Sequence, residues 1–199
     1  MAKEKPLFKR IVAGKYKSKP IKLPSKSTTR SSKAIVLESF FNTVQFEIID
    51  SVFVEVFSGS GSIGLEALSR GASQIYFMEK DRYALKILKE NVDSMEPQKC
   101  EIYGGDSFDN VKQIVSRLKK QNQKAYFYID PPFSFREGFE DIYDKTINLI
   151  KELPKEVVKL ITIEHMTGLD LPQNIGEYQK IKSKKFGKTS LTYYNILEI

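Results

Sequence analysis

Strand-length apolar runs alternate with helix-length amphipathic segments along most of this chain, and no other feature constrains its fold as strongly. The runs predicted to be strands are Val52–Phe57, Gln74–Glu79, Lys99–Tyr103, Ala125–Asp130 and Val157–Glu164. Helices are predicted to begin near Val36 and to cover Ser62–Ser69, Arg82–Val92, Phe108–Lys120 and the region Phe139–Ile150. Regular alternation of this kind is typical of a parallel β-sheet with helices on both faces.

The end of the chain departs from this pattern. Two extended segments, Tyr178–Phe186 and Ser190–Glu198, follow one another with Gly187 and Lys188 at the turn. Because no helix separates them, they are expected to form an antiparallel hairpin. The predicted fold is an α/β doubly wound sheet of seven strands that is closed by this C-terminal antiparallel hairpin.

A glycine-rich loop follows the first predicted strand of the sheet. The residues Gly59-Ser60-Gly61-Ser62-Ile63-Gly64 fit the pattern G-x-G-x-x-G between a strand and a helix, where the backbone can approach a ligand closely. Glu79 ends the next strand and can accept hydrogen bonds from both ribose hydroxyls of an adenosine. These two features alone leave a nicotinamide-dependent dehydrogenase open.

Two further carboxylates favour a different ligand. Glu55 lies near the end of strand one, where it would repel a pyrophosphate and attract a cationic amino-acid group or a sulfonium. Asp106 follows strand three, where it can accept a hydrogen bond from an adenine amine. Because the carboxyl ends of parallel strands meet at one rim, Glu55, Gly59, Glu79, Asp106 and Asp130 are expected to converge there.

The stiff turn Asp130-Pro131-Pro132-Phe133 follows the fourth predicted strand. Its prolines remove two backbone donors and leave carbonyl oxygens as acceptors. The Asp130 carboxylate and the Pro131 carbonyl can accept the two N–H bonds of an exocyclic base amine, and Phe133 can stack on the base. This arrangement would aim the lone pair of the nitrogen at an electrophilic methyl group. The turn by itself does not distinguish adenine from guanine.

The excess positive charge lies at the N-terminus. The chain has a formal net charge of +7, yet residues 1–33 hold eleven Lys/Arg and one acidic residue, so the remainder carries 21 basic and 24 acidic residues. Apolar residues alternate with the basic ones in Arg10–Lys15 and Pro20–Pro24, which predicts a small ordered arm. A polyanion such as a nucleic acid is the natural partner of such an arm.

Several stretches resemble one known family, the RsmD-type bacterial 16S rRNA guanine-N2 methyltransferases. The similar stretches are Phe57–Ala72, Asp130–Phe133, Arg10–Lys17, Glu38 with Phe41-Asn42, and Phe186–Leu191. Glu55 stands where that family usually has an aspartate. The resemblance extends over nearly the whole chain and implies a Rossmann-like class I methyltransferase fold, S-adenosylmethionine as methyl donor, and a guanine of 16S rRNA in a small ribosomal subunit assembly as acceptor.

The resemblance also extends the predicted site. The expected catalytic residues are Asp130, Pro131, Pro132 and Phe133. The expected cofactor-binding residues are Glu55, Phe57, Gly59, Gly61, Gly64, Glu79, Lys80, Asp106 and Ser107. The expected RNA-binding residues are Lys9, Arg10, Lys15, Lys17, Lys22 and Arg30. Residues 1–33 would form the RNA-contacting arm and residues 34–199 the methyltransferase domain.

Three alternatives remain open at this stage. A DNA adenine-N6 methyltransferase uses a similar turn, but it usually carries an extra target-recognition region, for which this chain has little room. A non-catalytic RNA-binding assembly factor would keep the arm and lose the chemistry. A dehydrogenase would leave the arm unexplained. His165 follows the fifth strand and is expected to be a loop residue or pocket wall rather than a general base.

Composition narrows the classes of protein to which the chain can belong. One cysteine excludes an internal disulfide, and with one histidine it makes a structural zinc site improbable, so no metal is expected. No apolar stretch approaches the roughly 20 residues that cross a bilayer, and the N-terminus lacks the apolar centre of a secretory signal. We therefore expect a cytoplasmic monomer that is not bound to a membrane.

Overall fold

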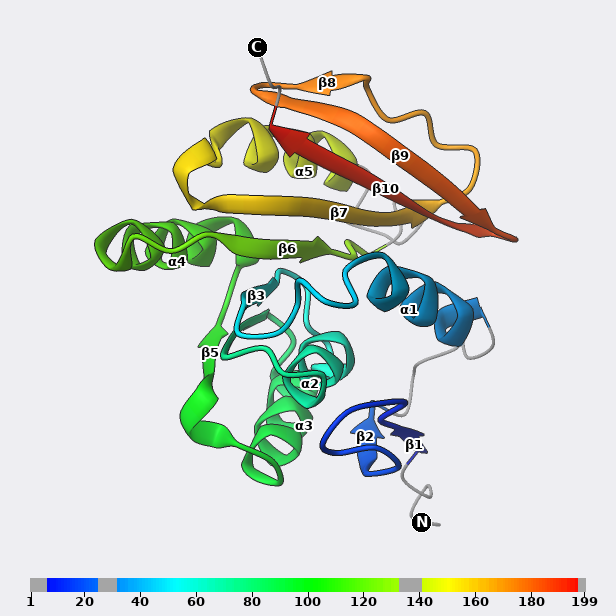
Figure 1. Cartoon of the computed structure of the whole chain (residues 1–199), viewed down its shortest axis with the longest axis vertical. Helices are drawn as coiled ribbons and strands as arrows, with labels where there is room; N and C mark the ends of the chain where they lie inside the picture. The colour runs from blue at the N-terminus through cyan, green and yellow to red at the C-terminus, as the bar shows by residue number, and fades with distance from the viewer. Residues whose placement is uncertain (1–6, 25–31, 133–140, 197–199) are drawn as a thin grey trace.

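The computed structural model of the chain describes residues 7–24, 32–132 and 141–196 (Figure 1). The strands are β1 (Leu7–Arg10), β2 (Pro20–Leu23), β3 (Val52–Glu55), β4 (Gln74–Glu79), β5 (Cys100–Gly104), β6 (Ala125–Ile129), β7 (Val158–Met166), β8 (Asn174–Ile175), β9 (Tyr178–Phe186) and β10 (Thr189–Ile196). The helices are α1 (Ser32–Thr43), α2 (Ser62–Ser69), α3 (Arg82–Asp93), α4 (Ser107–Gln121) and α5 (Ile142–Glu152). Short 3₁₀ turns, Pro97–Lys99 and Lys155–Val157, precede β5 and β7.

The large sheet has the order β5-β4-β3-β6-β7-β10-β9-β8. Pairing is parallel from β5 to β7 and antiparallel from β7 to β8. The Rossmann-like α/β fold with a C-terminal antiparallel hairpin is thus confirmed. The sheet differs from the seven predicted strands by one short edge strand, β8, because Asn174 and Ile175 pair with the start of β9.

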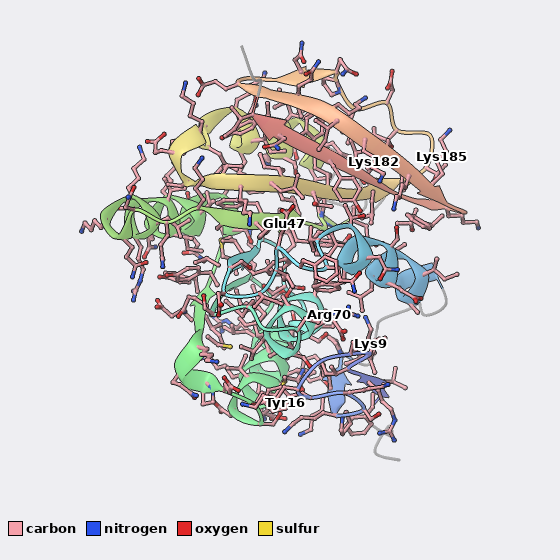
Figure 2. The ribbon with its side chains drawn as sticks, in the orientation of Figure 1. Lys9, Tyr16, Glu47, Arg70, Lys182 and Lys185 are labelled. Atoms are coloured by element: carbon pink, nitrogen blue, oxygen red, sulfur yellow. The ribbon has the colours of Figure 1, made fainter. Side chains whose placement is uncertain are left out.

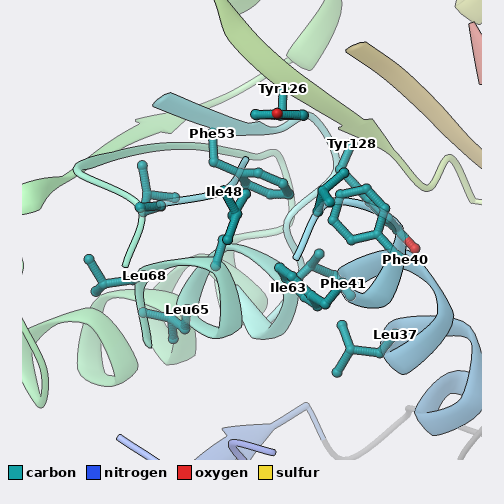
Figure 3. Close-up of a cluster of buried hydrophobic side chains, with 14 of the residues drawn as sticks. Leu37, Phe40, Phe41, Ile48, Phe53, Ile63, Leu65, Leu68, Tyr126 and Tyr128 are labelled. Carbon is teal, nitrogen blue, oxygen red and sulfur yellow. The ribbon is translucent and has the colours of Figure 1, made fainter. Parts of the chain in front are cut away.

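Successive residues of the parallel strands face opposite helical layers, which is why the central strand β6 is apolar throughout and β3 and β4 are apolar between their ends. One layer contains α1, α2 and α3, and its core includes Phe40, Phe53 and Tyr128. Figure 3 shows this cluster, with the aromatic rings of α1 packed against side chains of β3 and β6. The other layer contains α4 and α5, and its core includes Ile114 and Ile150.

The N-terminal residues form an antiparallel hairpin of β1 and β2, which Figure 1 shows beside α2 and α3. Ile11 and Ile21 are buried in the same core as α1 and α2. The backbone N–H groups of Val12 and Ala13 donate to the carboxylate of Glu66 in α2, at 2.8 and 3.0 Å. The expected ordered arm is therefore packed against the main sheet domain over residues 7–24.

Gly14 makes the closest approach of the hairpin to α2. Its φ is +82°, and an added Cβ would lie 1.8 Å from the backbone oxygen of Ser69. Beside it, the Lys15 N–H donates to that same oxygen at 2.7 Å, and the Ser69 hydroxyl donates to the Ala13 carbonyl at 2.6 Å. Glycine is required here because no side chain fits between the two backbones.

Among the described residues, no helix is long and apolar enough to span a membrane.

Candidate active site

The glycine loop and the Asp130 turn are neighbours because of the strand order. The chain leaves β3 for β4 on one side, whereas β6 lies on the other side of β3. Glu55 pairs with Tyr128 across β3 and β6, and the Val56 N–H donates to the Tyr128 carbonyl at 3.0 Å. Open α/β sheets bind ligands at such a switch point, at the carboxyl ends of the strands.

The glycines of the loop have different local roles. Gly59 has a φ of +52° and no atom within 4 Å of an added Cβ, so its backbone borders open space. At Gly61 and Gly64 an added Cβ would approach Leu88 and Phe77 to 2.4 Å, respectively. Gly59 therefore offers a surface for close ligand approach, while Gly61 lets the loop pack against Leu88 of α3 and Gly64 lets α2 pack tightly on β4.

Glu55 holds the start of α2. Its carboxylate accepts hydrogen bonds from the N–H groups of Ile63 at 3.3 Å and Gly64 at 2.8 Å, and the Gly61 cap supplies no side-chain acceptor of its own. Burial raises the pKa of Glu55 to about 8, against the opposing effect of these N–H groups and of the Lys9 charge; the Asp130 charge raises it further. The carboxyl expected to meet a cationic ligand is therefore also a helix cap, which the sequence did not indicate.

The raised pKa of Glu55 gives a pH-dependent stability. The folded protein favours the protonated carboxyl, so its contribution is complete below pH about 4.5 and is lost as the pH rises toward about 8. We expect the unfolding free energy of the wild type to fall relative to that of Glu55→Gln over this window, by at most about 1.4 kcal/mol per pH unit. Urea unfolding at pH 5, 6, 7 and 8 measures the difference. A constant difference between the two proteins across these values would contradict the assignment.

Glu79 lies beside Gly59 at the end of β4, and Asp106 follows the next strand, β5. The Glu79 carboxylate accepts from the N–H of Gly59 at 2.6 Å and from the N–H of Asp81 at 2.7 Å. Burial raises the pKa of Glu79, and these N–H bonds oppose that shift. Asp106 caps α4 by accepting from the Phe108 N–H at 3.0 Å, and it forms an ion pair with Lys80 at 2.9 Å.

Two more predicted cofactor residues lie at the same end of the sheet. Ser107 begins α4 and is buried, and the ring of Phe57 packs edge-on against Phe108 at 5.7 Å between centroids. A groove of about 570 Å³ adjoins this corner between α4 and α5. Lys80 and Asp106 line it, whereas Glu55, Asp130 and the glycine loop do not, so the groove overlaps only one end of the predicted site.

Asp130 follows β6 directly and is half-buried, and Pro131 next to it is buried. Asp130 acts electrostatically on Glu55, Tyr128 and Tyr143, which places it between the glycine loop and the start of α5. Pro132 is half-buried. Phe133, predicted to stack on the base, lies outside the described residues.

The predicted RNA-binding residues occupy the β1–β2 hairpin, except Arg30, which lies outside the described residues. Lys9 is close enough to Glu55 to affect its pKa, so the hairpin extends to the rim. Arg10 donates to the Ser18 carbonyl at 2.8 Å, and Lys17 is exposed.

Two hairpin lysines have acidic partners in the main domain. Lys15 forms an ion pair with Glu96, and Lys22 pairs with Glu90 at 2.7 Å. Part of the positive charge of the arm is thus used to attach it.

Several residues that organise the site were not predicted. Asn91 of α3 is buried, and its amide N–H donates to the carbonyls of Lys22 and Ser60 at 3.0 and 2.9 Å, which connects the hairpin to the glycine loop. Glu66 and Glu164 are also buried. Glu164 ends the predicted strand Val157–Glu164, so the strand-end signal that identified Glu79 could have identified Glu164 too, although β7 itself continues to Met166.

His165 is not placed to act as a general base. It lies within β7 and is buried; its Nε2 is 2.8 Å from the Thr192 hydroxyl and its Nδ1 is 2.9 Å from the Met166 carbonyl oxygen. Burial lowers its pKa. Over the described ranges, no cluster of three or more His, Cys, Asp or Glu residues could hold a metal ion.

The fold and the site together define a Rossmann-like methyltransferase. Its glycine loop follows β3, an acidic residue ends β4, and an Asp-Pro-Pro turn lies at the switch point of the sheet. A family model described as "Conserved hypothetical protein 95" matches residues 9–195. The chain belongs to this family, which is the RsmD-type methyltransferase family.

Three comparisons show the extent of the similarity. The chain is 26% identical to a putative rRNA methyltransferase of Bacillus subtilis, covering 93% of this chain and 97% of the relative. It is 29% identical to the ribosomal RNA small subunit methyltransferase D of Haemophilus influenzae, covering 93% and 92%. The crystal structure of a putative methylase from Haemophilus influenzae superposes with a TM-score of 0.71 at 30% identity, covering 96% of this chain and 99% of that one.

Proposed function

We propose that this protein transfers a methyl group from S-adenosylmethionine to the exocyclic N2 amine of a guanine in 16S rRNA, within a small-subunit assembly. The observation that carries the proposal is the position of Asp130 and Pro131 at the switch point, beside the glycine loop and Glu55. The names of its relatives in Bacillus subtilis and Haemophilus influenzae support rRNA as the substrate.

The residues at the rim fit the proposed cofactor. Open space next to Gly59 would admit the amino-acid part, and Glu79 and Asp106 offer carboxylates for the ribose and the adenine amine. Glu55 places a carboxyl where the ligand carries positive charge, so binding should lower its pKa and release a proton. When bound, S-adenosylmethionine supplies an electrophilic methyl group on a sulfonium.

The Asp130 turn would activate the base amine. The lone pair of that nitrogen is delocalised into the ring, which makes the amine a weak nucleophile. Hydrogen bonds from its two N–H groups to the Asp130 carboxylate and the Pro131 carbonyl would hold it in a more tetrahedral geometry and fix its direction. The rigid prolines keep both acceptors in place without reorganisation during the reaction.

The basic hairpin supports RNA as the partner. Exposed Arg10 and Lys17 lie on it, and Lys9 extends it to the rim. Figure 2 shows a second group of lysines on β9, with α1 between them and Lys9. Lys182 and Lys185 of this group are exposed. They lie on the part of β9 after Gln179, which forms an edge of the sheet. Lysines on an edge strand also discourage pairing with the strands of other chains. We therefore assign the RNA contact to the hairpin.

The test is methylation with labelled donor of three substrates: small subunits from a strain that lacks this protein, bare 16S rRNA, and duplex DNA. We expect label in rRNA, with nuclease-digest mass mapping placing it on guanine N2. Label in DNA alone would support the adenine-N6 alternative. No label together with no calorimetric binding of the donor would support a non-catalytic assembly factor.

Charge reversal in the hairpin should weaken RNA binding. Arg10→Glu combined with Lys17→Glu is expected to reduce the affinity for RNA about 10-fold or more. It should also make the negative slope of log K against log salt shallower by about 1–2. The matched control is Lys120→Glu, on an exposed lysine at the end of α4 opposite the rim. Lys9 is left intact because of its proximity to Glu55. If the salt slope of the double variant equals that of the control, the hairpin is not in the interface.

A further inference from the structure

A second carboxylate lies beside Asp130 at the rim. Ile129 of β6 pairs with Ile163 of β7, so the next residues along these parallel strands are Asp130 and Glu164. Alternation along the strands places both on the face that carries Tyr128, because Ile129 and Ile163 face the opposite core. Figure 3 shows Tyr128 on this face, beside Phe40 of α1.

Glu164 is held in place by a tyrosine. The buried Tyr128 hydroxyl donates to the Oε2 atom of Glu164 at 2.7 Å, and Glu164 is 3% exposed. The Phe40 ring packs against the Tyr128 ring at 5.0 Å between centroids, which fixes the phenol. A carboxylate has about four lone-pair positions, so its two oxygens can accept several hydrogen bonds at once.

The two carboxylates share their surroundings. After burial, the charges of Glu164 and Asp130 are the next causes that raise the pKa of Tyr128, and both charges also raise that of Tyr143 in the first turn of α5. The turn after β6 and Glu164 of β7 therefore place two carboxyl groups next to each other on one face of the sheet.

The hydrogen-bonding edges of the purines differ at this point. Guanine presents the N1–H donor next to its N2 amine, whereas adenine presents the N1 lone pair next to its N6 amine. A pair of acceptors matches the guanine edge, with three N–H donors in a row. With adenine, the same pair would place a carboxylate oxygen against the N1 lone pair, so that two acceptors would face each other.

We propose that Glu164 is the guanine-selecting residue of this enzyme, accepting the N1–H of the target base while Asp130 accepts an N–H of its N2 amine. Tyr128 is a positioning residue that orients the Glu164 carboxylate. This inference rests on the proposed function and goes beyond it, because the Asp130 turn by itself suits either purine amine.

The test uses 2-aminopurine, which keeps the C2 amine of guanine but has a lone pair at N1 in place of N1–H. Small subunits are reconstituted with 16S rRNA that carries guanine or 2-aminopurine at the mapped target, and kcat/KM is measured for each. We expect the wild type to prefer guanine by roughly 10- to 100-fold. Glu164→Gln should reduce the preference to within about threefold, because its amide can donate to the N1 lone pair.

Two further variants keep the test decisive. Tyr128→Phe keeps the carboxylate but removes its hydroxyl donor, and an intermediate preference is expected even if Glu164→Gln folds poorly. The control His165→Gln changes the adjacent buried residue on the opposite face of β7, and it should affect both substrates equally. An unchanged preference in Glu164→Gln, or in Tyr128→Phe if the former does not fold, overturns the inference. Absence of guanine methylation by the wild type would instead overturn the proposed function.

Discussion

Replacement of Asp130 by alanine is expected to lower the methyl-transfer rate by about 10²–10⁴-fold while the affinity for S-adenosylmethionine changes little. The carboxylate lies at the end of β6, where it would accept an N–H of the base amine, and the predicted cofactor contacts come from β3, β4 and the segment after β5. Asp130→Asn retains one acceptor oxygen and should therefore lie between alanine and the wild type.

Single-turnover rates on small subunits and donor-binding calorimetry separate these two quantities for Asp130. Asp93→Ala, an exposed aspartate at the end of α3, serves as the control and should match the wild type in both. If Asp130→Ala lost donor affinity in proportion to its rate, Asp130 would be a cofactor-binding or folding residue instead of part of the amine site.

Gly14→Ala is expected to detach the N-terminal hairpin from α2. A φ of +82° costs an L-residue roughly 1–2 kcal/mol, and the new methyl group would lie 1.8 Å from the Ser69 backbone oxygen, so the loop must move. Movement would break the 2.7 Å hydrogen bond from the Lys15 N–H and weaken the contacts of Glu66. We expect a lower unfolding midpoint, faster hydrogen exchange at Val12 and Ala13, and weaker RNA binding.

The matched control for Gly14→Ala is Gly187→Ala. Gly187 has a φ of +62°, but no atom lies within 4 Å of an added Cβ. Both variants share the cost of the left-handed conformation, and only the first has the clash. Equal losses of stability in the two variants would show that the approach of Gly14 to α2 does not hold the hairpin.

The strands and the turns at their ends could be predicted because their signals are local. Ala125–Asp130 is apolar in every position before the aspartate, so a strand buried on both faces and a turn at its end follow from the residues alone. The ordered arm was also indicated, by apolar residues between its lysines. Its attachment was not, because Glu66 and Asn91 act through contacts with residues more than 50 positions away in the sequence.

Other features depend on tertiary context. No residue pattern indicates that Glu55 caps α2, because its partners are backbone N–H groups and carry no residue signature. The two-residue β8 is too short for a periodic pattern. Glu164 carries the same strand-end signal as Glu79, but its position beside Asp130 follows from the pairing of β6 with β7. The roles of the predicted site residues remain predictions, and Phe133 and Arg30 lie outside the described residues.

The burial of Glu66 determines whether the N-terminal hairpin can be deleted without damage to the rest of the protein. Its side chain is 1% exposed, and it accepts two backbone N–H groups from the hairpin in addition to the Arg70 guanidinium at 2.8 Å. A deletion that starts the chain at residue 34 would remove both backbone donors and uncover the core around Ile11 and Ile21. Such a truncated protein would lose stability and RNA contacts together, so point substitutions on the exposed side of the hairpin are the sounder way to separate the two.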